Sequence, residues 1–482
     1  MEFRRFSGLT YVRGRCEMNP YHIVMNRDGA IYIPYASADY EQPPYLPVPG
    51  NPEEGKITVY DVETNDDEAV LTSRQAPAFT YYCDLDADAD WDNLPELSGD
   101  QSDRSECYAN RNMSGDGSAA NPWKNLTYAL EEIRCLAKCL CCEKFIRIVC
   151  SGEAHYSIEN IFPNLNGYGR VIIEGAKIKL TRNDLGGHVF SRCENVHFYN
   201  CSFSINSNTV GDYGHDIGVA VLEFCDNCKF FNCDISANAA FGSADNVSQT
   251  LRIDCISFCE NDLFYGCNIN AVANISQGDV KAYGTSGITY SVFVNCEISV
   301  HSNSSDNKNS IGYSYVYSVG AEGVYLNFYS CIVSAVAGSN DNVHRNSFSS
   351  AFHGGSRGQS HNNMYNSTGT AESYSTLVEN EFTYQLSQAY AFYNFDYASG
   401  CTANAKAISK SDKNAYSMAY CYMYYNAGVN NCNFSVSAKS NCTSSEQFNE
   451  REEECGVIKI AGECEAGSRC EWRTSEGTFE CF

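Results

Sequence analysis

A six-residue phrase recurs through the second half of this chain. It reads aromatic, any residue, Asn or Gly (Ser in the last copy), Cys, any residue, apolar, and its cysteines stand 32, 34, 29 and 35 residues apart. A phrase that returns at a nearly fixed period is the signature of a solenoid, in which each repeat stacks on the one before it. The five strong copies are Phe198–Phe203, Phe230–Ile235, Phe264–Ile269, Phe293–Ile298 and Phe328–Val333.

The residue before each cysteine predicts a tight corner. It is Asn, Asn, Gly, Asn and Ser in successive copies. Asn and Gly both tolerate a positive φ angle, so their exchange points to a corner in the left-handed region. The Phe two residues before the corner, the Cys after it and the apolar residue beyond can all point inward. Stacked coils would then build a Phe ladder, a Cys ladder and a ladder of Ile, Val and Phe.

Weaker copies extend the pattern in both directions. One lies upstream at Ile173–Ile178, and three lie downstream at 364–367, 398–401 and 429–434. Together the copies predict roughly nine coils of a solenoid. At about 4.8 Å per coil, they would form a rod about 40–50 Å long.

A resemblance to a known superfamily supports this reading. The segment from Gly115 to Thr127, which includes Asn121-Pro122-Trp123-Lys124, resembles the lead-in of pectate-lyase-like β-helix proteins. The resemblance covers about residues 113 to 440 and implies a right-handed parallel β-helix. In that superfamily an amphipathic capping helix follows, and residues 128–145 show apolar side chains at helical spacing. Such a helix would cover the open end of the solenoid.

The rest of the chain divides around this rod. Residues 1–105 are predicted to form an N-terminal β domain with an acidic linker, suited to attachment or assembly. It would contain a hairpin turning at Asp28-Gly29 and a further strand from Lys56 to Tyr60. Residues 106–150 would be the lead-in and capping helix, and residues 151–445 the parallel β-helix. Residues 446–482 would be a Cys-rich module with two disulfides whose pairing the sequence leaves open.

Charge and hydropathy exclude several classes of partner. The formal net charge is −26, with only 33 Lys and Arg residues among 482. Nucleic acid is therefore not an expected partner, because phosphate contacts need a basic face. No apolar run approaches the 18 residues of a membrane span. The N-terminus lacks the apolar core of a secretory signal, so a protein built for the outside would leave by another route, such as release of virus particles by lysis.

The chain holds 26 cysteines, far above ordinary usage. Those in the ladder, and a second column at Cys193, Cys225 and Cys259, are predicted to be mostly buried free thiols, with a few bridges between coils not excluded. A cluster from Cys135 to Cys150 is expected to pack or bridge rather than bind zinc. The C-terminal cysteines favour an oxidising final environment.

A column of acids offers a candidate cation site. Asp212, Asp245 and Asp279 follow the corner cysteines by about the same distance, and stacked carboxylates repel one another unless they are solvated or bound by a cation. We take these three residues as candidate calcium ligands. The alternative is that Asp simply suits turns. The alternating acids from Asp84 to Asp92 fit a solvated linker better than a calcium loop.

The segment from His344 to Asn363 combines donors with glycines. His353, Arg357 and His361 stand among Gly354, Gly355 and Gly358. No helical pattern supports a metal site there. We interpret the segment as an exposed loop, and these three residues as its candidate ligand contacts.

No complete catalytic motif of the pectate-lyase-like enzymes appears. Asp254 with Glu260 or Asp262 could form a carboxylate pair of the kind that cleaves glycosides, but nothing selects these acids over others. The predicted catalytic set is therefore empty.

The sequence thus predicts an all-β chain: a parallel β-helix with a helical cap, an N-terminal β domain and a Cys-rich C-terminal module. Its expected function is that of a non-catalytic structural or adhesion protein, resembling a viral tail-spike or fibre or a subunit of an extracellular appendage. It would display loops to a surface glycan or receptor, on a virion or at the extracellular surface. Expected partners are copies of itself, with a trimer implied by the resemblance, and other particle or appendage subunits. The alternative is a polysaccharide lyase or glycoside hydrolase on the same fold.

Overall fold

The computed structural model describes the backbone of a subset of the chain, and the account below concerns only those residues. They are 24–25, 31–34, 45–46, 52–65, 68–87, 115–124, 126, 129–130, 133, 144–156, 170–182, 187–210, 217–242, 250–275, 279–305, 311–319, 325–340, 344–353, 362–376, 384–393, 395–410, 414–422, 428–430, 432–441, 459–464, 469–474 and 477–481.

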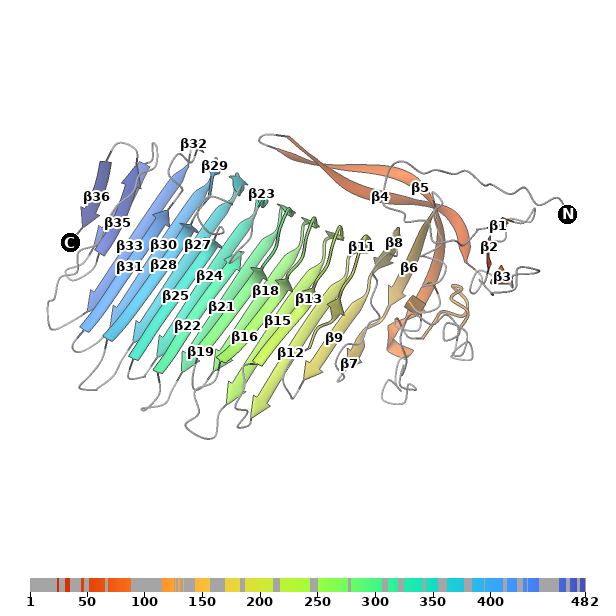
Figure 1. The fold of residues 1–482 in the computed structure, drawn as a ribbon, viewed down its shortest axis with the longest axis horizontal. Coiled ribbons are helices and arrows are strands. Elements are labelled where there is room, and N and C mark those ends of the chain that lie inside the picture. The colour runs from red at the N-terminus through yellow and green to blue at the C-terminus, as the bar shows by residue number, and fades with distance from the viewer. Residues whose placement is uncertain are drawn as a thin grey trace.

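The protein is an all-β parallel solenoid made of three long sheets (Figure 1). Each coil contributes a short strand to the first sheet, a long strand to the second and another to the third. The first sheet contains, in spatial order, β32 (Gly428–Asn430), β29 (Tyr397–Ser399), β26 (Asn363–Tyr365), β23 (Asn327–Tyr329), β20 (Val292–Val294), β17 (Leu263–Tyr265), β14 (Lys229–Phe231), β11 (Val196–Tyr199), β8 (Val171–Glu174), β6 (Phe145–Ser151), β5 (Ala69–Asp84) and β4 (Glu53–Thr64).

The second and third sheets complete the coils. The second contains β34 (Lys459–Cys464), β33 (Asn433–Asn441), β30 (Thr402–Lys410), β27 (Thr368–Thr376), β24 (Ile332–Asn340), β21 (Glu297–Ser305), β18 (Asn268–Ile275), β15 (Asp234–Gly242), β12 (Ser202–Val210), β9 (Lys177–Arg182) and β7 (Ala154–Tyr156). The third contains β10 (Phe190–Ser191), β13 (Ile217–Glu223), β16 (Thr250–Ser257), β19 (Asp279–Ser286), β22 (Ile311–Val319), β25 (His344–His353), β28 (Tyr384–Tyr393), β31 (Asn414–Tyr422), β35 (Arg469–Thr474) and β36 (Gly477–Cys481).

The interior ladders that the repeat predicts are confirmed. Phe198, Phe230, Phe264, Phe293 and Phe328 are register partners in successive coils, and their fully buried rings stack 4.7–4.9 Å apart. Each stacked pair adds about 0.5–1.5 kcal/mol to what burial alone gives. The register also places the weaker copies on these ladders, so Met364, Ala398 and Val429 continue the Phe column.

The Cys ladder has the predicted neighbours. The Cys233 thiol contacts both Cys201 and Cys267. Ser367 takes the thiol position between Cys331 and Cys401, where its hydroxyl accepts the Cys331 N–H at 3.1 Å. The ladder cysteines within the described residues are free and buried. Burial raises the pKa of the Cys233 and Cys267 thiols well above the ordinary value, because a thiolate would lose its hydration.

The corner before each ladder cysteine has the expected backbone. Asn200, Asn232 and Asn295 have φ between 51° and 53°, and Gly266 has φ 62°. At Gly266 a Cβ would lie 2.6 Å from the Asn232 side-chain oxygen, so a larger residue there would require the Asn232 side chain to move.

The hairpin β4–β5, here called the arm, joins the rod instead of standing apart from it (Figure 1). The C-terminal half of β5 pairs in parallel with β6, and β4 pairs with β5 along its whole length. The rest of the hairpin runs along the outer face of the first sheet. The predicted strand from Lys56 to Tyr60 lies within β4. The boundary at residue 105 stays a prediction.

The lead-in segment packs against β5. Trp123 stacks on Tyr81 with ring centroids 4.9 Å apart, and both side chains are buried. Leu126, Ala129, Leu130 and Ile133 are helical and buried in the main core. Their spacing matches one face of the predicted amphipathic helix. That this helix caps the rod stays a prediction.

The described ends of the chain are short strands. A three-stranded sheet contains β1 (Val24–Met25), β2 (Ile31–Pro34) and β3 (Tyr45–Leu46), which confirms the hairpin around Asp28-Gly29. A 3₁₀ turn, η1 (Leu85–Ala87), follows β5. At the other end, β34 extends the second sheet and β35 pairs with β31. The disulfides predicted in the tail concern side chains outside the described ones.

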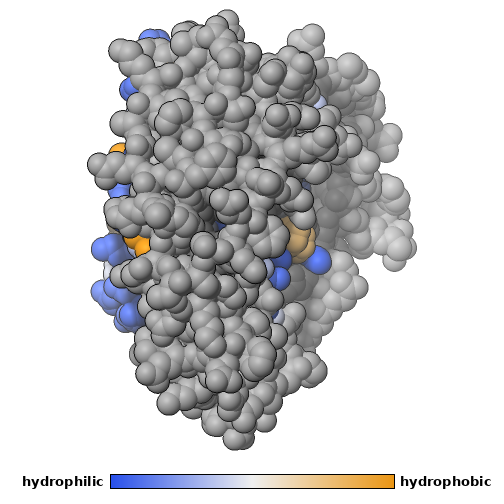
Figure 2. Space-filling view, turned by 90° about the vertical axis from the view of Figure 1, so that its left-hand side faces the viewer, coloured by the Kyte–Doolittle hydropathy of each residue, from blue (hydrophilic) through white to orange (hydrophobic). Residues whose placement is uncertain are grey.

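The described residues visible at the C-terminal end of the rod are mainly hydrophilic (Figure 2). Figure 2 looks along the rod from its C-terminal end, and the coloured residues there are mostly hydrophilic with a few isolated apolar spots. Among the described residues no helix is long and apolar enough to cross a membrane.

Candidate functional site

A groove lies between the arm and the outer face of the first sheet. Its volume is about 460 Å³, within the range of small-ligand sites. The arm supplies one wall, the outward side chains of the first sheet supply the floor, and the corner asparagines supply the rim. The lining residues are Lys56, Ile57, Thr58, Tyr60, Leu71, Arg147, Ile172, Glu174, Tyr199, Asn200, Phe231, Asn232 and Tyr265.

Aromatic contacts hold the arm in place. The Tyr60 ring packs edge-on against Tyr199, with ring centroids 5.6 Å apart. It also packs at a tilt against Phe231, with centroids 5.7 Å apart. The Tyr199 hydroxyl accepts the Tyr60 N–H at 3.2 Å. Further along, the Tyr329 hydroxyl donates to the Asn65 carbonyl at 3.4 Å. The arm is thus fastened to coils far from it in sequence, and it braces the rod lengthwise.

One ion pair also links the arm to the rod. Lys229 lies 2.8 Å from Asp61, whose side chain is 61% exposed. Burial raises the pKa of Asp61, but the Lys229 hydrogen bond, the Val62 N–H and the charge of Lys229 together outweigh it and leave the pKa lowered. Because the carboxylate is largely exposed, this pair stabilises little, and the aromatic contacts carry the attachment.

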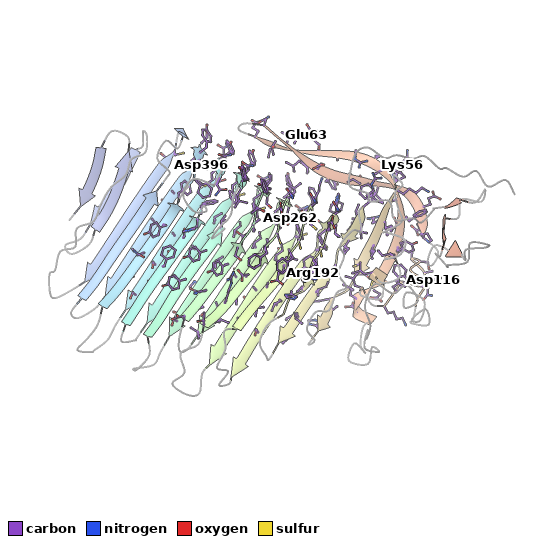
Figure 3. All side chains as sticks on the ribbon, viewed as in Figure 1. Lys56, Glu63, Asp116, Arg192, Asp262 and Asp396 are labelled. Carbon is purple, nitrogen blue, oxygen red and sulfur yellow. The ribbon has the colours of Figure 1, made fainter. Side chains whose placement is uncertain are left out.

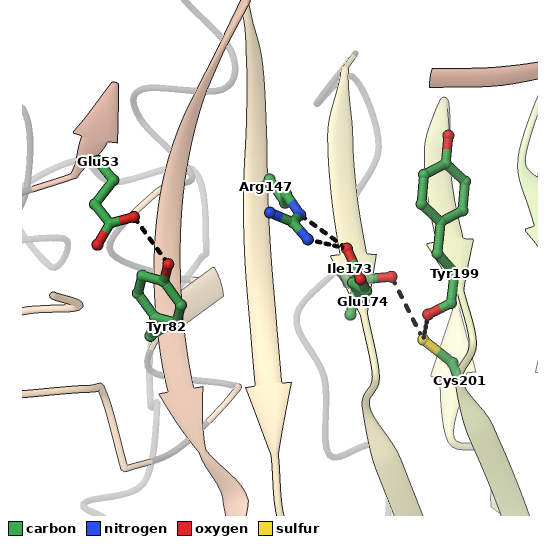
Figure 4. Close-up of polar contacts among 7 residues, drawn as sticks. All are labelled: Glu53, Tyr82, Arg147, Ile173, Glu174, Tyr199 and Cys201. Carbon is green, nitrogen blue, oxygen red and sulfur yellow. Dashed lines mark hydrogen bonds and ion pairs between the residues drawn. The ribbon is translucent and has the colours of Figure 1, made fainter. Parts of the chain in front are cut away.

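Two cations reach the groove in different ways. Arg147 donates to Glu174 from Nε at 2.8 Å, with its Nη2 at 2.6 Å from the same oxygen (Figure 4). Lys56 stands exposed on β4 near the base of the arm (Figure 3). Aromatic floor, amide rim and a lysine are the groups that hold a polar ring such as a sugar.

Burial shifts the pKa of Tyr199 on the groove floor and of its neighbour His197, whose Nδ1 lies 3.3 Å from the Tyr199 hydroxyl. It lowers the pKa of His197 to about 3, and the neighbouring Lys229 adds to this lowering. It raises the pKa of Tyr199 to about 12. Both side chains are therefore neutral at pH 7. The Tyr199 ring and the His197 ring act as uncharged surfaces and hydrogen-bonding groups, not as charged ones.

His353 ends β25 among aromatic rings. It meets Tyr317 edge-on at 5.0 Å and Phe348 at 6.4 Å, and Phe348 contacts Tyr390 at 5.1 Å. Burial lowers the pKa of His353 to about 4. The predicted ligand contact thus stands beside a half-buried aromatic patch on the outside of the third sheet. The two other predicted contacts, Arg357 and His361, lie outside the described residues.

The predicted calcium column is described at one position only. Asp279 opens β19 and is partly buried. Asp212 and Asp245 lie outside the described residues. That the three carboxylates lie together and bind calcium therefore stays a prediction. Within the described part of the chain, no three His, Cys, Asp or Glu side chains gather as metal ligands. Of the alternating acids from Asp84 to Asp92, two are described: Asp84 ends β5, and Asp86 lies in the 3₁₀ turn, where its carboxylate accepts the Glu153 N–H at 2.9 Å.

The acids considered for glycoside cleavage have structural contacts. Asp254 is 5% exposed and accepts a hydrogen bond from Arg252 Nε at 2.8 Å. Asp262 is 2% exposed, and its Oδ1 accepts the Cys228 N–H at 2.7 Å. Burial raises the pKa of both carboxyls, and that of Asp262 well above its ordinary value. Glu260 is exposed in the corner before β17.

A second thiol cluster lies inside the corner that precedes the first sheet. The Cys225 thiol contacts Cys193, Cys228 and Cys259. The column of Cys193, Cys225 and Cys259 was predicted. Cys228 was not predicted to join this column, because no cysteine stands at the same position in the coil before or after it. The four thiols are free and buried, which makes them part of the packed core.

Sequence reasoning missed the groove. The arm has no repeat, and its contact with Tyr199 spans 139 residues. One signal was available: an aromatic residue follows four of the five ladder Phe residues, at Tyr199, Phe231, Tyr265 and Tyr329. In a strand this neighbour points outward, so the pattern indicates an aromatic outer face that needs a cover.

Comparison with family models, curated proteins and solved structures finds no match for this chain.

Proposed function

We propose that this protein is a non-catalytic structural or adhesion protein, exposed on a virus particle or an extracellular appendage, where it contacts a surface glycan or a receptor. The observation that supports it best is the unbroken stack of parallel coils with an arm fastened along one side. A solenoid is stiff because each coil buries its edges on the next. A stiff rod with an aromatic, polar-rimmed groove suits display and contact.

The buried acids agree with a non-catalytic role. Asp254 and Asp262 serve as hydrogen-bond acceptors inside the coils. Free, buried thiols pack the interior of the described coils. The same rod could associate with copies of itself and with other subunits of the particle or appendage.

Mass spectrometry of purified particles and appendages tests the location. The proposal expects this chain among their structural proteins at stoichiometric abundance. Its presence only in the soluble fraction of the producing cell contradicts the proposal. A reducing-sugar and unsaturated-uronide assay over a panel of glycans tests the non-catalytic part, and clear turnover would overturn it.

A further inference from the structure

Four aromatic side chains stand exposed along one edge of the rod. Phe224, Phe258, Tyr290 and Tyr325 are 47%, 47%, 50% and 39% exposed. They occur in four successive coils, one per coil, in the corner between the third and the first sheet. Phe224 and Phe258 share one position of that corner, and Tyr290 and Tyr325 share a second position three residues further along the chain. We call these four residues the corner strip. Phe224 stacks on Phe258 at 5.5 Å, and Tyr290 stacks on Tyr325 at 4.7 Å.

The backbone at these positions disfavours aromatic residues. The four φ angles are 52°, 51°, 53° and 58°. A bulky residue with φ in this region is a genuine outlier, whereas Gly and Asn adopt it readily. The same chain has Gly or Asn at equivalent corner positions in neighbouring coils. Gly287 follows Phe258 in the next coil, with the Phe258 ring over it, and Asn261 precedes Tyr290.

Burial does not compensate for this strain. Each ring keeps between about two fifths and half of its surface in water, so little hydrophobic stabilisation is gained. The rings form two stacked, exposed pairs, and an exposed apolar patch marks an interaction site more often than a packing need. Strained positions of this kind persist where function selects them. The strip therefore fits a role in binding better than a role in folding.

Acidic side chains run beside the strip. Glu194, Asp226 and Glu260 are bridge partners in successive coils, and Thr289 continues the column. Asp226 Oδ1 accepts a hydrogen bond from Asn261 Nδ2 at 3.2 Å, and Glu260 is exposed. Like charges one coil apart repel each other. In the preceding coil, Arg192 holds the corner position that Phe224 holds in its own coil. Its positive charge ends the acidic part of the strip on that side.

These features select the chemistry of a partner. One ring stands in the corner of each of four successive coils, at about 4.8 Å per coil, and acids stand beside the first two rings at Asp226 and Glu260. This spacing suits a linear polymer lying along the rod. The carboxylates repel an anionic polymer and attract a cationic one. Sugar rings offer C–H faces to aromatic side chains and hydroxyls to carboxylates and amides. An amino sugar adds a positive charge for the acid column.

We propose that the corner strip binds a glycan of amino sugars with free, protonated amines. The inference rests on the proposed function, because it names the class of glycan that an exposed rod would contact. It assigns the contact to this edge of the rod, not to the groove beneath the arm.

Calorimetric titration of the full chain with a glucosamine hexamer tests the proposal. The N-acetylglucosamine hexamer and the galacturonate hexamer serve as neutral and anionic probes. We expect the glucosamine hexamer to bind at least tenfold more tightly than either, and more weakly as salt rises. No binding of the glucosamine hexamer, or equal binding of the neutral or anionic probe, overturns the proposal.

Variants locate the site. F224N/F258N and Y290N/Y325N should each weaken binding at least tenfold with no fall in melting temperature, because Asn suits the backbone there. E260Q should weaken binding several-fold. The matched controls are Glu297→Gln, at an exposed acid on β21, and Ile332→Asn, at a 58% exposed apolar residue; both should bind as the natural chain does.

Two outcomes would move the site elsewhere. Binding that survives both double variants, or that is lost in Lys56→Gln at the groove, overturns the proposal. Either result leaves the proposed function standing, because mass spectrometry of particles tests that function separately. Conversely, absence of the chain from particles would leave a measured strip–glycan contact intact.

Discussion

Two corners of the same coil follow opposite rules. At the corner that leaves the first sheet, the left-handed positions hold Asn200, Asn232 and Gly266, the residues that the backbone favours. The corner that enters it has two left-handed positions. One holds Asn227 and Asn261 in the same way, but the other holds Phe224 and Phe258, which the backbone disfavours and burial does not reward. The first corner shows what the fold requires of a sequence. The second shows residues that the fold does not require.

The largest expected effect lies in the interior. Phe264 is fully buried and stacks on Phe230 at 4.8 Å and on Phe293 at 4.7 Å. Phe264→Ala should lower the free energy of unfolding by about 3–5 kcal/mol, measured by urea titration. Phe258→Ala, at the exposed corner six residues earlier, should change it by less than about 1 kcal/mol. Equal losses at the two sites would erase the contrast between buried ladder and exposed strip.

The next largest expected effect is the loss of folding stability at low pH that arises from buried His197. The folded pKa of His197 is about 3 against an ordinary 6.5, so the unfolded chain binds more protons between these values. Stability contributed by neutral His197 is complete above pH 6.5 and is lost as pH falls towards 3, by up to a few kcal/mol.

Urea unfolding at pH 7.5 and pH 4.5 measures this. His197→Gln should reduce the difference between the two pH values, whereas the surface variant His155→Gln should leave it unchanged. His353, with a pKa of about 4, adds a smaller contribution of the same sign, so the double variant His197→Gln/His353→Gln should flatten the profile further. A steeper profile in the His197 variant would contradict the burial argument.

A smaller effect sharpens the comparison between corners. Asn295→Gly should be nearly neutral, because both residues adopt the φ of 51° found there. Asn295→Val should cost about 1–2 kcal/mol, since a branched residue resists the left-handed region. Thermal unfolding of the two variants checks this, and a neutral Val would show that the corner tolerates any residue.

The smallest expected change concerns the arm's ion pair. Lys229→Met removes a contact with a largely exposed carboxylate, so it should cost less than about 1 kcal/mol. Tyr60→Ala should instead loosen the arm and speed its cleavage by a protease of broad specificity. If Lys229→Met exposes the arm as much as Tyr60→Ala does, the aromatic contacts are not what fastens it.

The sequence predicted the features that repeat. Phe198 and its equivalents recur once per coil, and Asn200 and its equivalents each mark a corner. The sequence alone therefore predicted the solenoid, its register and its Phe ladder. The arm could not be predicted, because the contact of Tyr60 with Tyr199 joins segments that share no pattern. Its strand Lys56–Tyr60 was foreseen, but not where that strand lies.

The corner strip had a signal that is easily misread. Phe224-Cys225 and Phe258-Cys259 repeat 34 residues apart, and an aromatic beside a buried cysteine is ordinarily taken as core. Alternation places the thiol inside and the ring outside. Telling an exposed ring from a core ring required the exposed fraction and the φ angle of each Phe. Periodicity alone supplies neither.

The central claim is that the corner strip serves binding and not folding. The most direct measurement is the free energy of unfolding of the fourfold variant F224N/F258N/Y290N/Y325N beside that of the natural chain. The account predicts an unchanged or greater stability, because Asn relieves the backbone at all four corners. A loss of several kcal/mol would show that the rings hold the rod together, and would contradict it.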